Sequence, residues 1–158
     1  MADVKPDPKK AFKIYFDRSK TSIDGVLTLQ DHLGNKIIDR IHVRSGAEGY
    51  QNKEWVREHS PIPYGVYWLT LASNNKGKKA GDAGIGEAYP ISSNGDGMNI
   101  WGDKPNEHRS EIMLHEENKK RGSAGCVVVV NANDWANIQK ELATIAKKGY
   151  TLIRFEVT

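Results

Sequence analysis

The chain has 158 residues, of which 38% are hydrophobic and 27% are charged, and this composition excludes the disordered, collagen-like and membrane classes. A domain of this length can bury a hydrophobic core without help from disulfides or metals. The 23 basic and 20 acidic residues are interspersed and leave a net charge of only +3, so we predict no nucleic-acid binding.

The N-terminus shows no targeting or membrane segment. Residues 1–10 are rich in lysine, aspartate and proline, and they lack the apolar stretch of a signal peptide. No apolar run approaches the roughly 20 residues that a membrane-spanning helix needs. We therefore expect no transmembrane segment and no visible signal peptide, with a flexible tail at residues 1–10 and a single domain at residues 11–158.

The first part of the chain is predicted to consist of β-strands. Segments 12–17, 25–30 and 36–43 alternate apolar and polar residues or are rich in β-formers, and turn residues separate them. A polar stretch follows, and the prolines of the sequence Ser-Pro-Ile-Pro-Tyr-Gly-Val-Tyr at 60–67 then fix the approach to an apolar strand at 66–72.

The middle of the chain is rich in glycine, lysine and asparagine. We interpret residues 73–103 as a long loop with a short strand at 98–101. The spacing of Gly81, Gly84 and Gly86 matches no nucleotide-binding fingerprint. Because long loops inside compact domains usually bind ligands, we predict that this loop forms a wall of a substrate site.

The last third combines short strands with one helix. Segments 111–115 and 126–130 are predicted strands, and residues 134–148 form the one convincing helix, followed by a strand at 150–157. The helix places Ile138, Leu142 and Ile145 on one face. Its predicted N-cap is Asn133 or Asp134, and its predicted C′ residue is Gly149.

The chain contains a single cysteine, Cys126, which excludes an intramolecular disulfide framework and a cysteine-rich zinc site. We expect no cofactor and no metal, because the histidines show no ligand pair at metal spacing. Taken without context, a lone cysteine is usually a small buried side chain. The five histidines are at positions 32, 42, 59, 108 and 115.

The neighbours of Cys126 favour a reactive role instead. His115 ends one predicted strand and Cys126 begins the next, so the two side chains can meet at adjacent strand ends. A neighbouring imidazolium would stabilise the thiolate. Gly125 would allow close approach of a substrate, and its amide and that of Cys126 could donate to an oxyanion. Ser123 could orient the site through its hydroxyl or carbonyl, or it could simply form the turn before the glycine.

The sequence Ser-Ala-Gly-Cys at 123–126, preceded by a histidine that ends a strand, resembles the signature of the L,D-transpeptidase family. The segment at 60–67 is similar to the Pro-x-Gly-x-Tyr sequence of that family, and Asn131 with Asp134 resembles its Asn-x-Asp motif. The resemblance covers residues 60–145. It implies a mainly β fold of the α+β type, a β-sandwich with one C-terminal helix, in which Cys126 forms a thioester with peptidoglycan stem peptides and His115 is the base.

The chain departs from the family pattern at three points. The spacing from Asn131 to Asp134 is longer by one residue than in the family. Ala124 stands where the family usually has histidine, and Val128 stands where it usually has the arginine expected to hold a substrate carboxylate. Arg109, Arg121 or Arg44 could replace that arginine. We expect Arg109, Trp101 and Tyr67 to bind substrate, because a guanidinium can clamp a carboxylate with two hydrogen bonds and the aromatic residues lie near the predicted cleft. The resemblance also implies that a backbone carbonyl orients His115, so Glu116 and Glu117 are not needed as members of a triad. We expect both carboxylates to be exposed to solvent.

These observations predict a peptidoglycan-targeting cysteine enzyme, either a carboxypeptidase or endopeptidase or a transpeptidase. The departures resemble toxin-type relatives, so we expect a secreted antibacterial effector or a phage lysis enzyme, delivered to the periplasm by a secretion system or by lysis, and an immunity protein as partner for a toxin. Two alternatives stay open: a non-catalytic wall-binding module with an inert cysteine, and a structural component of a phage or secretion machine.

Overall fold

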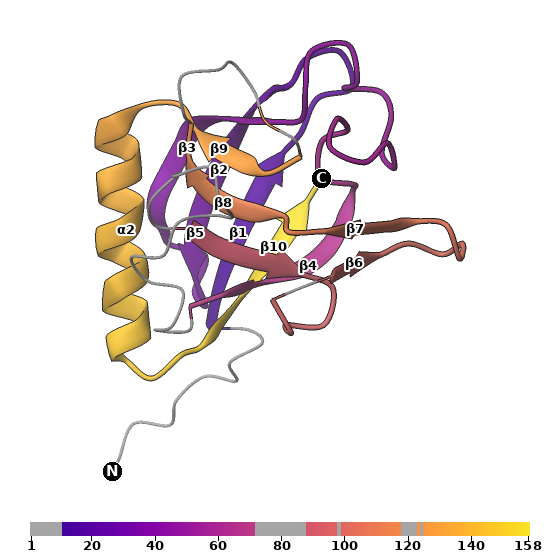
Figure 1. The fold of residues 1–158 in the computed structure, drawn as a ribbon. Coiled ribbons are helices and arrows are strands. Elements are labelled where there is room, and N and C mark those ends of the chain that lie inside the picture. The colour runs from indigo at the N-terminus through magenta and orange to yellow at the C-terminus, as the bar shows by residue number, and fades with distance from the viewer. Residues whose placement is uncertain (1–10, 72–87, 98, 118–122, 124) are drawn as a thin grey trace.

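The computed structural model describes residues 11–71, 88–97, 99–117, 123 and 125–158, and in this part of the chain eight strands close into a barrel with a helix beside it (Figure 1). The order around the barrel is β1-β10-β4-β5-β8-β9-β3-β2, and a separate hairpin, β6–β7, extends away from it. The elements are β1 Phe12–Asp17, β2 Asp24–Asp31, β3 Lys36–Ser45, β4 Gly65–Thr70, β5 Ala88–Ser92, β6 Asn99–Trp101, β7 His108–Ser110, β8 Met113–Glu116, β9 Val127–Val129, α2 Ala132–Lys147 and β10 Leu152–Val157.

The mainly β prediction is confirmed, but the predicted sandwich is wrong because the sheet is a closed barrel. β1 pairs with β2 on one side and with β10 on the other, so the ring has no free edge. Sandwiches and barrels share the same alternation of inward and outward residues along each strand. Local patterning therefore does not distinguish the two, and only the long-range parallel pairing of β1 with β10 closes the ring.

The strand registers place one continuous set of apolar side chains inside the barrel. Phe16 lies opposite Leu27 on β2 and Val157 on β10, and the same alternation continues around the ring. Burying this surface is the main favourable term in folding. The interior side chains with at most 1% exposure include Ile14, Phe16, Leu27, Leu29, Val43, Leu69, Ile91, Leu114, Val127, Val129, Ile153 and Phe155.

Helix α2 contacts β3, β8 and β9 and joins the same hydrophobic core. The predicted face is confirmed, since Ile138, Leu142 and Ile145 are all buried. The predicted N-cap is wrong by two or three residues, because the side chain of Asn131 accepts hydrogen bonds from the amides of residues 133 and 134 and so starts the helix earlier. Gly149 has a φ of +95° after the last turn, as predicted for a C′ residue.

The sequence analysis missed two strands, the short β7 of the hairpin and the buried β5. All five residues of β5 are buried, and it pairs with both β4 and β8, inside the segment predicted to be loop. Pro90 cannot donate to a ladder, and proline argues against an inner strand, so the pattern did not indicate one. About half of the predicted loop, residues 73–87, lies outside the described residues, as does the predicted tail at 1–10.

The strand predicted at 111–115 begins two residues later in the structure. β7 ends at Ser110 and β8 begins at Met113, and between them Glu111 has a positive φ of +58°. This break turns the chain from the hairpin into the barrel. No described helix is long and apolar enough to cross a membrane.

Candidate active site

The parallel pair β8–β9 brings the predicted base and nucleophile onto neighbouring strands. Leu114 pairs with Val127 and both point into the barrel, so by strand alternation His115 points to the other side. Cys126 directly precedes β9 and lies two register positions from His115. Strand spacing and rise put their Cα atoms roughly 8 Å apart, which two inclined side chains can bridge. In the described part of the chain no hydrogen bond joins the imidazole to the thiol.

His115 is held in one orientation by the backbone. Its ring is 3% exposed, and Nδ1 donates to the carbonyl of Glu116 at 2.7 Å. Because Nδ1 carries the proton, Nε2 is the nitrogen with a lone pair. Burial lowers the pKa of His115 below its ordinary value, and the Glu116 carbonyl offsets this in part. The neutral imidazole is therefore the resting form, and the predicted orientation by a backbone carbonyl is confirmed.

The carboxylates next to His115 are less exposed than predicted. Glu116 and Glu117 are both half-buried, and Glu117 accepts a hydrogen bond from Arg44 at 2.7 Å. Arg44 also donates to Asp24 at 2.6 Å. Arg44 is therefore held by two carboxylates, and its guanidinium is committed to an ion-pair network rather than to a substrate.

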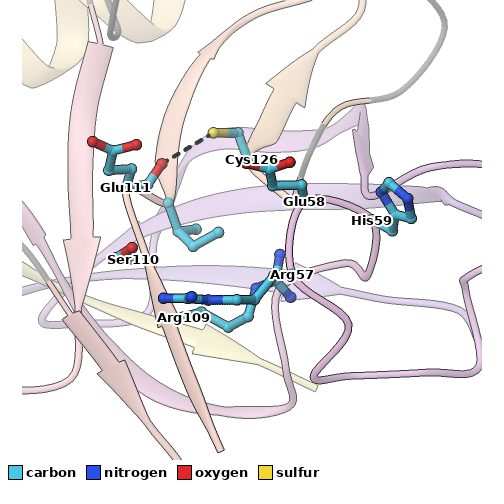
Figure 2. A pocket seen from close by; sticks show the side chains of 8 residues that line it. Arg57, Glu58, His59, Arg109, Ser110, Glu111 and Cys126 are labelled. Carbon is cyan, nitrogen blue, oxygen red and sulfur yellow. Dashed lines mark hydrogen bonds between the residues drawn. The ribbon is translucent and has the colours of Figure 1, made fainter.

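Cys126 is half-buried and lines a cavity of about 710 Å³ (Figure 2). Its thiol donates to the carbonyl of Glu111 at 3.5 Å. Burial raises the pKa of this thiol, while a backbone amide of Met113 and the charge of Arg109 lower it in part. Burial thus favours a neutral thiol beside a neutral imidazole, which is not the thiolate–imidazolium pair invoked from the sequence.

Ser123 and Ser45 hold the turn that carries the cysteine. The Ser123 hydroxyl donates to the carbonyl of Cys126 at 2.6 Å and accepts from the amide of Gly125 at 3.2 Å. Ser45, 1% exposed, donates to the carbonyl of Gly125 and accepts from the amide of Ile62, both at 2.9 Å. Ser123 therefore shapes the turn, and the Gly125 amide, predicted to face an oxyanion, already has a partner.

Arg109 packs against the turn that carries Cys126. Its side chain is buried, with 2% of the residue exposed, and it donates to the backbone carbonyls of Glu54, Ser60 and Pro61 at 3.1, 2.9 and 3.3 Å. A Cβ atom on Gly125 would collide with its guanidinium. Arg109 contributes to the cavity wall, but these contacts tie segment 54–61 to the nucleophile turn, so the residue is placed as a structural support rather than as the predicted substrate clamp.

Tyr67 and Trp101 lie away from the cysteine, around a second cavity of about 400 Å³. Tyr67 is 4% exposed and its hydroxyl donates to the carbonyl of Pro63 at 2.8 Å, so it anchors the turn before β4. Trp101 is 55% exposed on the β6–β7 hairpin and stacks on His108, with ring centroids 4.1 Å apart. Of the predicted substrate residues, Trp101 is the one with an accessible face.

Several residues of the cysteine cavity were not predicted. Its walls include Arg57, Glu58 and His59, all exposed, as well as Ser110, Glu111 and Ile112. Residues 44–60 show no apolar period, so the sequence indicated only a polar loop there. Within the described residues, no group of three histidine, cysteine or acidic side chains is placed to hold a metal ion.

Comparison with known proteins identifies one family. Residues 39–151, from within β3 to just before β10, match the model of the Tlde1 domain. The match includes both His115 and Cys126. The comparison identified no L,D-transpeptidase family, so the resemblance drawn from the motif stays a prediction. No curated protein and no solved structure matches the chain.

Proposed function

The chain belongs to the Tlde1 domain family, a family of type VI secretion effectors, and on this premise we propose that it is a secreted antibacterial effector that cleaves or exchanges peptidoglycan stem peptides through Cys126. Such an effector is delivered to the periplasm of a target cell. A cell that makes such an effector needs an immunity protein that neutralises this effector.

The parallel β8–β9 pair is the observation that carries the catalytic part of this proposal. It places a thiol in a cavity wall and an oriented, neutral imidazole on the adjoining strand, on the same side of the sheet. Nucleophilic catalysis by cysteine requires a thiol that substrate can reach and a base held by a third group. Here the third group is the Glu116 carbonyl.

The first half of the reaction is addition of sulfur to the substrate carbonyl. The thiol rotates from the Glu111 carbonyl toward His115, Nε2 removes its proton, and sulfur attacks the carbonyl carbon of the stem peptide. The charge on the imidazole is stabilised by the Glu116 carbonyl. Collapse of the tetrahedral intermediate breaks the C–N bond, and His115 returns the proton to the departing amine.

The second half resolves the thioester on Cys126. Water, deprotonated by His115, gives hydrolysis, whereas an amine of a second stem peptide gives transfer. In both reactions the carbonyl carbon leaves sulfur and the thiol regains its proton. Ser123 and Ser45 hold the cysteine turn during these steps, and we propose that the exposed face of Trp101 contacts a more distant part of the substrate.

The rate of the reaction is expected to remain high at pH values where a free histidine would already be protonated. Burial disfavours the imidazolium and lowers the pKa of His115 below 6.5, so the base stays neutral until the pH falls below that value. The acid limb of kcat/KM should therefore lie below pH 6.5. Profiles measured between about pH 4 and pH 8 check this, and an acid limb at or above 6.5 contradicts the assignment.

The proposed function is tested by blocking the thiol and following both protein and substrate. Because Cys126 is the only cysteine, iodoacetamide modifies one site. Untreated protein should shorten or exchange tetrapeptide stems in purified muropeptides and show an acyl adduct by intact mass, and alkylated protein should do neither. Chromatography of the products distinguishes hydrolysis from transfer.

The same experiment decides between the enzyme and its alternatives. If neither protein alters the muropeptides, but both bind sacculi equally well, the chain is a wall-binding module. If neither acts nor binds, and the protein assembles into large particles, it is a structural component. Both results contradict the catalytic proposal.

A further inference from the structure

The cavity at Cys126 has a wall formed by residues 57–59, opposite the wall that contains Glu111 (Figure 2). Hydrogen bonds hold this wall in a defined conformation. Amides of residues 59 and 60 donate to the carbonyl of Val56 at 3.2 and 3.0 Å, and the amide of Val56 donates to the hydroxyl of Ser60 at 3.0 Å. Arg109 holds the carbonyls of Ser60 and Pro61. Arg57 is therefore carried on a fixed turn.

Among the described arginines, Arg57 and Arg40 are the two whose guanidinium groups donate to no described residue, and of these two Arg57 lines the cysteine cavity. Arg18, Arg44, Arg109 and Arg154 each donate to a carbonyl or carboxylate of the protein. Arg57 is exposed, lines the cavity of the cysteine, and makes no hydrogen bond or ion pair with any residue that the structure describes. An arginine in this situation presents a planar fork of donors that fits a carboxylate with two parallel bonds.

The charges of the cavity also favour an anion at this place. Figure 2 shows the guanidinium of Arg57 beside that of Arg109, and the charge of Arg57 adds to burial in lowering the pKa of Arg109. A bound carboxylate would relieve this repulsion. Glu58 and Glu111 are the acidic residues of the wall; neither pairs with Arg57, and the Glu111 carboxylate points away from the thiol.

Two residues in the wall of the same cavity have strained backbone conformations. Glu58 and Glu111 have φ values of +64° and +58°, and Arg40 is the third such non-glycine residue in the described part of the chain. Non-glycine residues held in this region are strained and cluster at functional sites. The conformation of Glu58 fixes the direction in which the turn presents Arg57, and that of Glu111 aims its carbonyl at the thiol.

We propose that Arg57 binds the terminal α-carboxylate of a short stem peptide and so makes the enzyme selective for stems with a free carboxyl end. The inference rests on the proposed function and specifies its substrate. The motif position that usually supplies an arginine holds Val128, which is 1% exposed, while Arg44 and Arg109 are engaged elsewhere. Arg57 is thus a specificity residue that replaces the missing arginine from a different loop.

The test compares two muropeptides that differ only in the terminal carboxyl group, one free and one amidated. Wild type should prefer the free acid about 10- to 100-fold in kcat/KM, as expected for charge-assisted hydrogen bonds. Arg57→Gln should remove the preference by raising KM for the free acid, with the rate on the amide unchanged. Arg57→Lys should restore part of it. Arg40→Gln is the matched control, because this arginine lines a separate surface hollow, and it should behave as wild type.

A second measurement separates this inference from the proposed function. Binding of both muropeptides is titrated with Cys126→Ala and with Cys126→Ala combined with Arg57→Gln, so that no turnover is needed. Tighter binding of the free acid that disappears with Arg57→Gln supports the inference, even if turnover fails. A preference that survives Arg57→Gln, or equal losses on both substrates, overturns it. Absence of binding and turnover with every variant overturns the proposed function as well.

Discussion

Replacing Cys126 with alanine is expected to reduce the rate of stem-peptide processing by about 10⁴-fold or more, because removal of a nucleophile leaves only the contributions of binding. Cys126→Ser should be nearly as inactive. A buried neutral imidazole removes a proton from a thiol far more readily than from a hydroxyl, whose pKa is much higher. Muropeptide chromatography under single-turnover conditions measures both rates.

The control for this prediction is the stability of the same variants. The cysteine directly precedes β9, and among the described residues its thiol makes only weak hydrogen bonds, with the Glu111 carbonyl and the Met113 amide, so thermal unfolding should stay within a few degrees of wild type. Activity of Cys126→Ala above about one hundredth of the wild-type rate would be incompatible with a thioester mechanism. A collapse of stability would leave alkylation of the native protein as the decisive measurement.

Gly125→Ala is expected to lower the free energy of unfolding by about 2–4 kcal/mol and to reduce activity with it. Two effects combine at this position. The φ of Gly125 is +124°, which side chains rarely adopt, and an added methyl would overlap the guanidinium of Arg109 and lie 3.0 Å from Ile112 Cδ1 and the Ser60 carbonyl. Relief of the clash requires Arg109 to leave the carbonyls that it holds.

Gly34→Ala separates backbone strain from collision. Gly34 has a φ of +81°, and a Cβ there would meet no atom within 4 Å, so its cost should be close to the roughly 1 kcal/mol of an unfavourable backbone alone. Urea denaturation of the two variants gives both free energies. Equal losses at the two positions would mean that Arg109 yields without cost and does not support the nucleophile turn.

The sequence predicted the features of the site that depend on residues close together in the chain. His115 at one strand end and Cys126 at the next indicated a pair, and the parallel register of β8 and β9 is consistent with it. Sequence spacing did not indicate that the pair would be buried. Burial of His115 and Cys126 changes the resting state to two neutral groups, which is an effect of packing around the strands.

The parts that could not be predicted depend on contacts between distant segments. Arg109 was assigned to the substrate because a guanidinium suits a carboxylate, yet its partners are carbonyls of residues 54–61, far away in the chain. Arg57 lies in a polar stretch without apolar periodicity, and its position depends on that contact and on the hydrogen bonds within residues 56–60. Barrel closure is likewise a long-range property, and Pro90 concealed the buried strand β5.

The pairing of β1 with β10 also determines how the molecule reaches this state. β10 lies between β1 and β4, so a gap remains between these two strands until β10, the last described strand, pairs with both. Contacts between strands so distant in the chain carry a large loop-closure entropy, and β-rich topologies of this kind fold in about milliseconds to seconds. During that interval β1 and β4 each have an unpaired edge, to which another chain can add. The protein concentration during refolding therefore determines whether the free edges of β1 and β4 pair with β10 of the same chain or with a strand of another chain.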